Sequence, residues 1–380
     1  MNPRQRLQRI NKRNLLVISA ASLHSGVQFL YLHTRKDSWS VSEYQVSPYL
    51  QKIRSGISNL LNGSIQTHTL KEFSRLDQHF SIFLLDSTRS FLSLLPRHAQ
   101  KPDLIVLHSF ALWNDFTEDD PDSRWNISLG DPQILASGVN SPVLTDFIRH
   151  DILNKGDGRP PIIEGDKRIA QPNKSTTVFI NIGLLSQVTI IGRNSIIDSH
   201  SGPGTCLINK AAKEIGTAEG FDRDGSLAQT GVVDTDCLEQ LATSEWFQKP
   251  APKFTKPDYF DALYNQQCLQ KLSSLDRLST VTALSSRTIS NFYKKEIRGF
   301  PQPEVIYISG GGVNNTMLTE LLSAYLSPIH VEPVEEIGIP TEGRIPLALG
   351  LTVDTALSKR TALRLAKNKE HYPLGKWVFP

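Results

Sequence analysis

Two glycine turns and one small-residue turn have the residue types that phosphoryl transfer needs. In "ISAASLHSGVQFLYL" (18–32), small residues separate two apolar runs, a pattern typical of a phosphate-binding β-turn-β. The stretch "EVIYISGGGVNNTMLTELLSAYL" (304–326) indicates a strand, a glycine turn and a helix, and backbone N–H groups in such a turn can bind an anion or a nucleotide. A second glycine turn, Gly202 to Gly204, also precedes a predicted helix.

The first of these turns lacks the carboxylate that nucleotide enzymes use to hold Mg²⁺. It offers His24, and the first acidic residue of the chain is Asp37. Mg²⁺ prefers hard oxygen ligands, so a neutral imidazole does not replace a carboxylate there. Residues 18–32 are therefore either a phosphate-binding hairpin that has lost its metal ligand or an ordinary hairpin.

Asp151 is the carboxylate best placed to act as a general base. It follows the apolar run in "SPVLTDFIRHD" (141–151), read as a buried strand, and precedes the glycine and proline loop "NKGDGRPP" (154–161). A carboxylate at the end of a strand, facing a cleft, can activate a water molecule. A structural role for this aspartate is the alternative.

Composition indicates a globular chain of two domains. Its 380 residues exceed the usual size of one core, and 39% of them are hydrophobic. The net charge of +3 is too small to indicate a nucleic-acid partner. No window approaches the roughly 18 apolar residues that a membrane span needs, so we expect no integral membrane segment.

The N-terminal segment and the cysteines bear on location. "MNPRQRLQRINKRN" is basic and acid-free, which fits an organelle transit segment, the start of a signal peptide or, as the favoured interpretation, a frayed basic tail before the first strand.

Cys206, Cys237 and Cys268 stand 31 residues apart, a spacing that fits no zinc motif, and an odd count fits no closed disulfide framework. A reducing compartment, and hence the cytoplasm, is expected.

Strands alternate with helices along the whole chain, which predicts an α/β fold. Residues 15–32 and 175–191 both read strand-turn-strand, residues 102–110 read as a buried strand, and 212–300 is mainly helical. Two related lobes with a cleft between them follow from this repetition. We place the N-terminal lobe at 1–150, completed by a C-terminal helix in about 345–380, and the C-terminal lobe at 151–344.

The middle of the chain resembles a known family. "LGDPQILASGVNSPVLTDFIRHDILNKGDGRPPI" (129–162) resembles the signature of the anhydro-N-acetylmuramic acid kinases, in which Gly-Asp-Pro, Asp-Phe-x-x-x-Asp and Gly-x-Gly-x-Pro follow one another. Further stretches are similar to family motifs in the same order: "INIGLLSQVTII", "SGPGTCLIN", "FDRDGSLAQTG", "FQKPAPKFT" and "ISGGGVNNTML". The resemblance covers about residues 102–350.

The resemblance implies a fold and a reaction. The fold is that of sugar kinases, actin and Hsp70, with two ribonuclease-H-like lobes that close on ATP and substrate. Family enzymes open the 1,6-anhydro ring of anhydro-N-acetylmuramic acid with water and place the γ-phosphate of ATP on O6. ATP and Mg²⁺ are the implied cofactors, a small-molecule sugar and a nucleotide the implied partners, and a homodimer is a further expectation because relatives are often dimeric.

The resemblance also assigns roles to residues. Asp151 matches the catalytic aspartate of the family, and a weak metal ligand is expected at Asp198, which lies two residues before the family's aspartate position. Substrate-binding residues are expected at His108, Asp131 and Glu342. The nucleotide-binding residues are expected at Ser22, Gly202, Gly204, Gly310, Gly311 and Gly312.

The chain departs from the family at charged ligands. His200 stands where the family has an aspartate, and Gly343 or Arg344 where it has a sugar-contacting glutamate, so Glu342 could serve only with a shift. Residues 18–32 then look like a phosphate hairpin without its metal ligand. Two functional hypotheses follow: an active or weakly active kinase of an anhydro sugar, or a pseudokinase that keeps the fold as a binding or regulatory module.

Overall fold

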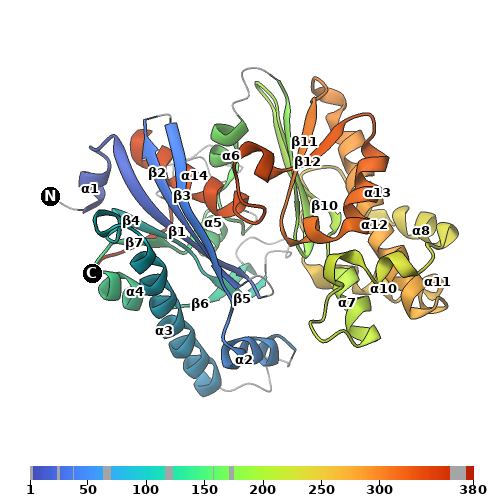
Figure 1. The fold of residues 1–380 in the computed structure, drawn as a ribbon, viewed down its shortest axis with the longest axis horizontal. Coiled ribbons are helices and arrows are strands. Elements are labelled where there is room, and N and C mark those ends of the chain that lie inside the picture. Colours follow the sequence, from blue (N-terminus) through green and yellow to red (C-terminus); the bar gives the residue numbers. More distant parts are fainter. Residues whose placement is uncertain are drawn as a thin grey trace. The chain divides into compact units, whose positions relative to one another are not determined.

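The computed structural model divides into two compact units (Figure 1). The first comprises Met1–Ile169 and Ile345–Pro380, and the second comprises Ala170–Arg344. Residues 151–169 thus belong to the first unit, whereas the sequence analysis placed them in the second lobe. The structure describes residues 3–23, 26–36, 38–62, 70–115, 123–156, 158–170, 175–359 and 374–380.

The first unit is built on a six-stranded sheet of order β13-β7-β4-β1-β2-β3. Three long strands form an antiparallel meander, and shorter strands extend the sheet beyond β1. β4 is buried along its whole length, as a near-continuous apolar run predicts for a central parallel strand. The strands are β1 Lys12–Ser22, β2 Gly26–Arg35, β3 Ser38–Ser47, β4 Leu104–His108, β7 Val143–Thr145 and β13 Lys376–Val378.

The helices of the first unit cover this sheet. The long helix α3 (Leu70–Leu94) buries an apolar stripe that includes Phe80, Leu84 and Phe91. A short hairpin, β5 (Phe110–Asp115) and β6 (Trp125–Leu129), follows β4. The other helices are α1 Pro3–Leu7, α2 Gln51–Asn62, α4 Pro132–Val139, α5 Phe147–Leu153, α6 Ile163–Ala170 and α14 Arg344–Lys359.

A buried ionic network fastens α14 to the sheet of the first unit. The carboxylate of Asp354 is 1% exposed, and it accepts hydrogen bonds from Arg13, Thr34 and Arg168, each at 2.7 Å. These partners come from β1, β2 and α6, so one side chain joins four elements. Buried charges are stable only when they are paired and hydrogen-bonded, as they are here.

The second unit carries a five-stranded sheet of order β10-β9-β8-β11-β12. β8, β9 and β10 are antiparallel neighbours, while β11 runs parallel to β8 and β12 parallel to β11. This order matches that of the first unit, where β1, β2 and β3 form the meander and β4 and β7 the parallel extension. The strands are β8 Thr177–Ile182, β9 Leu185–Ile191, β10 Ile196–Pro203, β11 Val305–Ser309 and β12 His330–Pro333.

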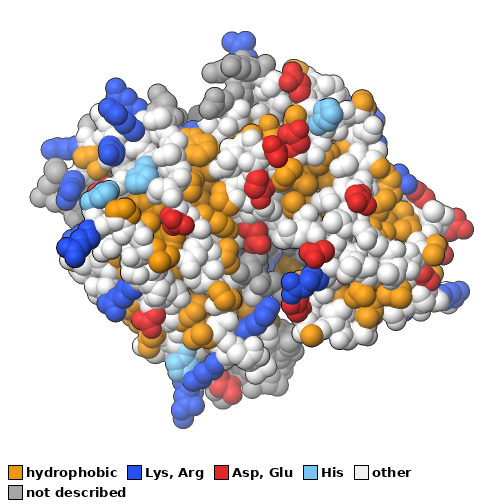
Figure 2. Space-filling view, in the orientation of Figure 1, with side chains coloured by type: hydrophobic (Ala, Val, Ile, Leu, Met, Phe, Trp, Pro, Cys, Tyr) orange, Lys and Arg blue, Asp and Glu red, His pale blue; other side chains and the backbone are white. Residues whose placement is uncertain are grey.

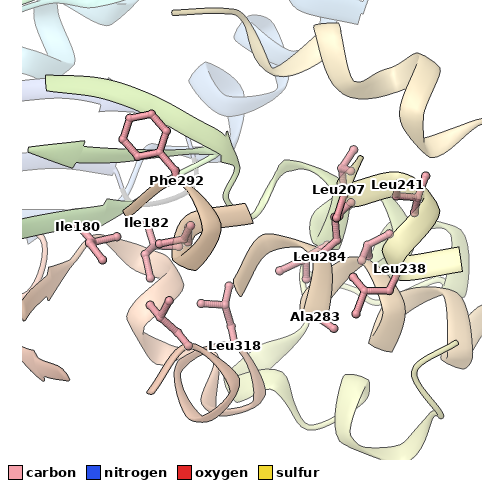
Figure 3. Close-up of a cluster of buried hydrophobic side chains, with 14 of the residues drawn as sticks. Ile180, Ile182, Leu207, Leu238, Leu241, Ala283, Leu284, Phe292 and Leu318 are labelled. Carbon is pink, nitrogen blue, oxygen red and sulfur yellow. The ribbon is translucent and has the colours of Figure 1, made fainter. Parts of the chain in front are cut away.

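Helix α12 (Ser274–Glu296) forms the centre of the second unit. Its residues Leu278 to Ser286 are all buried, and Leu284 and Phe292 belong to an apolar cluster with Ile180 of β8 and Leu318 of α13 (Figure 3). A helix that is buried all round is typical of the core of a larger unit. The remaining helices are α7 Cys206–Ile215, α8 Thr235–Ala242, α9 Glu245–Gln248, α10 Asp261–Tyr264, α11 Gln267–Gln270 and α13 Thr316–Leu326.

The predicted fold class is confirmed. The protein is α/β, and both units place three antiparallel strands beside parallel ones, as ribonuclease-H-like lobes do. The strand-turn-strand pairs expected at 15–32 and 175–191 are β1–β2 and β8–β9. The expected strand ending at Asp151 is wrong in part, because β7 ends at Thr145 and Asp151 lies in α5.

The cysteine expectation needs a correction as well. Cys237 of α8 and Cys268 of α11 form a disulfide, with 5.5 Å between their Cα atoms, and Cys206 is the free thiol. The sequence separation of 31 residues gave no sign of this, because the pairing depends on how α8 and α11 pack.

The basic N-terminal stretch lies on the surface of the first unit. Arg6, Arg9 and Lys12 are exposed, and Lys and Arg side chains gather around α1 in Figure 2. Arg13 differs, because it is buried and its Nε donates to the carbonyl of Leu7. The apolar run that could have been the core of a signal peptide forms the buried middle of β1. Among the helices of the described residues, none has the length and apolar character to cross a bilayer.

Candidate functional site

A small polar pocket opens where β4 ends in the first unit. It has room for about one water molecule. Polar groups from three segments meet in it: the end of β4, the strand β6 and the turn between β7 and α5. The lining residues are Leu107, His108, Ser109, Asn126, Ser128, Asp146, Phe147 and Ile148.

His108 enters this pocket as a neutral side chain. It is 8% exposed, and its Nδ1 lies 3.4 Å from the hydroxyl of Ser19 on the neighbouring strand β1. Burial lowers the pKa of His108 to about 4, so the imidazole carries no charge at neutral pH. The sequence expectation placed His108 in a substrate site, and the structure places it in a pocket with other polar groups.

Asp146 is the residue between the end of β7 and the start of α5. Its backbone is left-handed (φ 61°), a conformation that aspartate and asparagine adopt more readily than most residues, and it separates β7 from α5. Its carboxylate makes no capping hydrogen bond to the first turn of α5. The side chain thus stays available to the pocket.

Asp151 is enclosed by the loop that follows α5. The side chain is 5% exposed, and one carboxylate oxygen accepts a hydrogen bond from the backbone N–H of Arg159 at 3.2 Å. The Gly156 N–H donates to the backbone carbonyl of Asp151 at 2.8 Å, and a Cβ on Gly156 would collide with the carboxylate. Only glycine therefore fits at 156, and the loop fixes the orientation of the aspartate.

Asp131, expected to bind substrate, has a structural role in the first unit. It is the N-cap of α4, and its carboxylate accepts a hydrogen bond from the N–H of Gln133 at 2.8 Å. Pro132 occupies the first helical position, where a missing N–H costs nothing. The residue is exposed and does not line the pocket, so the structure does not bring Asp131 together with His108.

The triple-glycine turn of the second unit is only partly open. The Gly310 N–H (φ 90°) donates to the carbonyl of Thr341 at 2.9 Å, and a Cβ on Gly312 would collide with Ile182. Gly311 is exposed, and Oε1 of Glu342 lies 3.8 Å from the position that its Cβ would take. The structure thus brings Glu342 to this turn, where a ligand could reach Gly311.

The Gly-Pro-Gly turn is closed by its own hydrogen bonds. The N–H groups of Gly204, Thr205 and Cys206 donate to the carbonyls of Gly183 and Leu184 at 2.8–3.1 Å. A Cβ on Gly204 would collide with the Gly183 carbonyl. Close packing against the β8–β9 turn therefore explains glycine at 204, and these three donors are already used.

Asp198 and His200, at and beside the expected metal position, both make hydrogen bonds within the second unit. Oδ1 of Asp198 accepts hydrogen bonds from Gln187 at 2.6 Å and Thr189 at 2.8 Å, both on β9. Nδ1 of His200 accepts from the N–H of Thr255 at 3.1 Å, which fixes the neutral ring with its proton on Nε2. Within the described parts of the chain no group of three or more His, Cys, Asp or Glu side chains could hold a metal. Asp198 and His200 therefore offer one carboxylate between them, fewer oxygen ligands than a protein-held Mg²⁺ site needs.

Arg344 stands at, or next to, the position where the family has a sugar-contacting glutamate. It is completely buried, its Nε donates to the hydroxyl of Ser309 at 3.2 Å, and its guanidinium lies 5.2 Å from the ring centroid of Phe179. A cation over an aromatic face is a stabilising contact. The charge at this position is thus opposite to that of the expected acid.

Several expectations fall outside the described residues. His24 is one of them, and for Ser22 only the backbone, as the last residue of β1, is described.

Sequence reasoning missed Asn126, although "WNISL" alternates polar and apolar residues and so places Asn126 and Ser128 on one face of a strand.

Comparisons with known proteins identify the family. The sequence model of the family described as anhydro-N-acetylmuramic acid kinase matches residues 12–358. The chain is 24% identical over 329 residues to the anhydro-N-acetylmuramic acid kinase of Caldanaerobacter subterraneus subsp. tengcongensis, covering 83% of each protein. It is 30% identical over 219 residues to that of Idiomarina loihiensis, covering 57% of this chain and 58% of the relative.

A solved structure matches more distantly. The activator of 2-hydroxyisocaproyl-CoA dehydratase from Clostridium difficile, solved with bound ADPNP, is 12% identical and has a TM-score of 0.40, with 92% of this chain and 96% of that chain covered. The identification rests instead on the family match, which spans most of the sequence. The chain belongs to the anhydro-N-acetylmuramic acid kinase family.

Proposed function

We propose that the protein is an ATP-dependent kinase of a 1,6-anhydro amino sugar, with Asp151 as the base. The observation that carries this proposal is the enclosure of Asp151 by Gly156 and Arg159, with the Arg159 N–H donating to the carboxylate. A positioned carboxylate is what water activation requires. The curated relatives share the name of such a kinase, which supports the choice of sugar.

The proposed reaction uses one water molecule and one ATP. Asp151 takes a proton from water as the water oxygen bonds to the anomeric carbon, and the bond between that carbon and O6 breaks. O6 then forms its bond to the γ-phosphorus, and ADP leaves. The triple-glycine turn, with Gly311 exposed and Glu342 beside it, is the proposed nucleotide contact. No step is assigned to a protein-held metal, and Mg²⁺ would arrive with the nucleotide phosphates.

A pseudokinase is the second candidate function, and the second unit supplies its support. Asp198 and His200 make hydrogen bonds within the sheet, and Arg344 is a buried cation at the expected position of an acid. The N–H groups at 204–206 are used by carbonyls of the same unit. A protein of this kind would bind the sugar and transfer no phosphate.

The test is a phosphorylation assay with an Asp151→Asn variant. Purified protein is incubated with 1,6-anhydro-N-acetylmuramic acid, ATP and Mg²⁺, and the sugar 6-phosphate is followed by phosphorus NMR. We expect product from the wild type and a loss of roughly a hundredfold or more in Asp151→Asn. Asp86→Asn is the matched control, because Asp86 is an exposed carboxylate on α3.

Two results would go against the kinase. Equal rates for the wild type and Asp151→Asn would remove Asp151 from the chemistry. Sugar binding without any phosphorylated product would favour the pseudokinase.

A further inference from the structure

The amide of Asn126 is a buried polar group whose hydrogen bonding is incomplete. The residue is 5% exposed, and its Oδ1 accepts a hydrogen bond from the hydroxyl of Ser128 at 2.8 Å. Its Nδ2 has no hydrogen-bond partner among the described residues. A buried donor without a partner is costly, and in native proteins such a group calls for an explanation.

The unsatisfied amide lines the pocket that also holds His108 and Asp146. These side chains come from three separate segments, β6, β4 and the β7–α5 turn, so the pocket is a product of the fold. The backbone that presents Asp146 is left-handed, a conformation that is costly for most residues and is retained where the surrounding structure enforces it.

The charges in the pocket restrict the chemistry of its ligand. Asp146 is the one ionisable group besides His108 among the lining residues, and no lysine or arginine lines the pocket. A phosphate or carboxylate would therefore meet the like charge of Asp146, with no cation among the lining residues to offset it; the nearby Arg149 is engaged by the carbonyl of Asn126. An ammonium group has no acceptor to offer the Asn126 amide. A hydroxyl both accepts and donates, so it can satisfy the amide and the carboxylate together.

We propose that this pocket binds one hydroxyl group of a carbohydrate, with Asn126 Nδ2 donating to the hydroxyl oxygen and the Asp146 carboxylate accepting its proton. The size of the pocket, about one water molecule, matches a single hydroxyl. A site built to hydrogen-bond a hydroxyl rejects an analogue without it, because its polar groups are then left unsatisfied. Asn126 and Asp146 are thus residues that determine specificity. The inference rests on the proposed function for the choice of sugar.

The experiment is calorimetric titration of the full-length protein without nucleotide. The probe is 1,6-anhydro-N-acetylmuramic acid, followed by 1,6-anhydro-N-acetylglucosamine. Asn126→Leu removes the donor at similar volume, and we expect it to weaken sugar binding roughly tenfold to a hundredfold. Asn114→Leu is the matched control, because Asn114 pairs with Asn126 on the opposite strand but does not line the pocket.

A second variant keeps the test informative if Asn126→Leu folds poorly. Asparagine tolerates the left-handed conformation of Asp146, so Asp146→Asn removes the charge while it preserves the backbone. We expect weaker sugar binding in this variant with an unchanged melting temperature.

The outcomes separate this inference from the proposed function. Loss of binding in Asn126→Leu and Asp146→Asn, but not in Asn114→Leu, supports the pocket even if no phosphate is transferred. Sugar binding that is the same in all variants overturns the pocket and leaves the kinase untouched. Absence of binding of either sugar to the wild type overturns the inference directly.

Discussion

The two units share a strand order but bury polar groups in different ways. In the first unit the buried polar groups include full charges and a histidine: Asp354 between Arg13 and Arg168, and His108 at the pocket. The second unit also buries charged side chains, such as Arg344, and its central helix α12 adds buried hydroxyls that donate to its own carbonyls, as Thr282 does to Leu278 at 2.8 Å. A hydroxyl that donates to its own helix has no second proton to donate to a ligand.

The two units also differ in whether their polar groups find hydrogen-bond partners within the described structure. The first unit keeps polar groups, such as Asn126 and Asp146, that the described structure does not satisfy internally. In the second unit, Gly204 packs against the carbonyl of Gly183, and Nδ1 of His200 accepts a hydrogen bond from the N–H of Thr255. The two units thus differ in how many of their polar groups remain available to a ligand.

The largest effect is expected from breaking the ionic network of the first unit. Asp354→Ala leaves Arg13 buried without its carboxylate, and loss of one partner of a buried pair costs about 3–5 kcal/mol of unfolding free energy. Urea unfolding measures this loss. The exposed control Asp86→Asn should remain within about 0.5 kcal/mol of the wild type. A small effect of Asp354→Ala would mean that the apolar contacts of α14 suffice to hold it.

A smaller loss of unfolding free energy is expected when the pH is lowered, because His108 then becomes protonated. Its pKa is lowered from 6.5 to about 4 in the folded protein, so between these pH values the unfolded chain binds a proton that the folded chain does not. The contribution of the neutral imidazole to stability is fully present above pH 6.5 and is lost as the pH falls toward 4, by about 3 kcal/mol in total.

A His108→Gln variant isolates this contribution. The unfolding free energy of the wild type should fall relative to that of the variant between pH 6.5 and 4, and the difference between them should stay constant above pH 6.5. Parallel pH profiles of the two proteins would show that His108 is protonated in the folded state as readily as in the unfolded one.

Much of the fold could be predicted from the sequence because its signals are local. The strand-turn-strand patterns at 15–32 and 175–191 correspond to β1–β2 and β8–β9. The helical interpretation of 212–300 is confirmed by α8 to α12.

The missed features depend on contacts between distant segments. Arg344 was noted only as standing at or beside the position of a family glutamate, and its burial against Phe179 and Ser309 had no sequence signal. The apolar run before Asp151 was read as one strand, but the left-handed Asp146 divides it into β7 and α5. The pocket combines residues 108, 126 and 146, whose proximity no periodicity could indicate.

The most direct test of the contrast between the two units is calorimetric titration with a non-hydrolysable ATP analogue, with and without Mg²⁺. Because Asp198 and His200 are engaged in the sheet, we expect the analogue to bind with an affinity that Mg²⁺ changes by less than about threefold. An affinity that rises tenfold or more with Mg²⁺ would contradict the account, since side chains such as Asp198 or Glu342 would then hold the ion. Absence of nucleotide binding in both conditions would remove the kinase function itself.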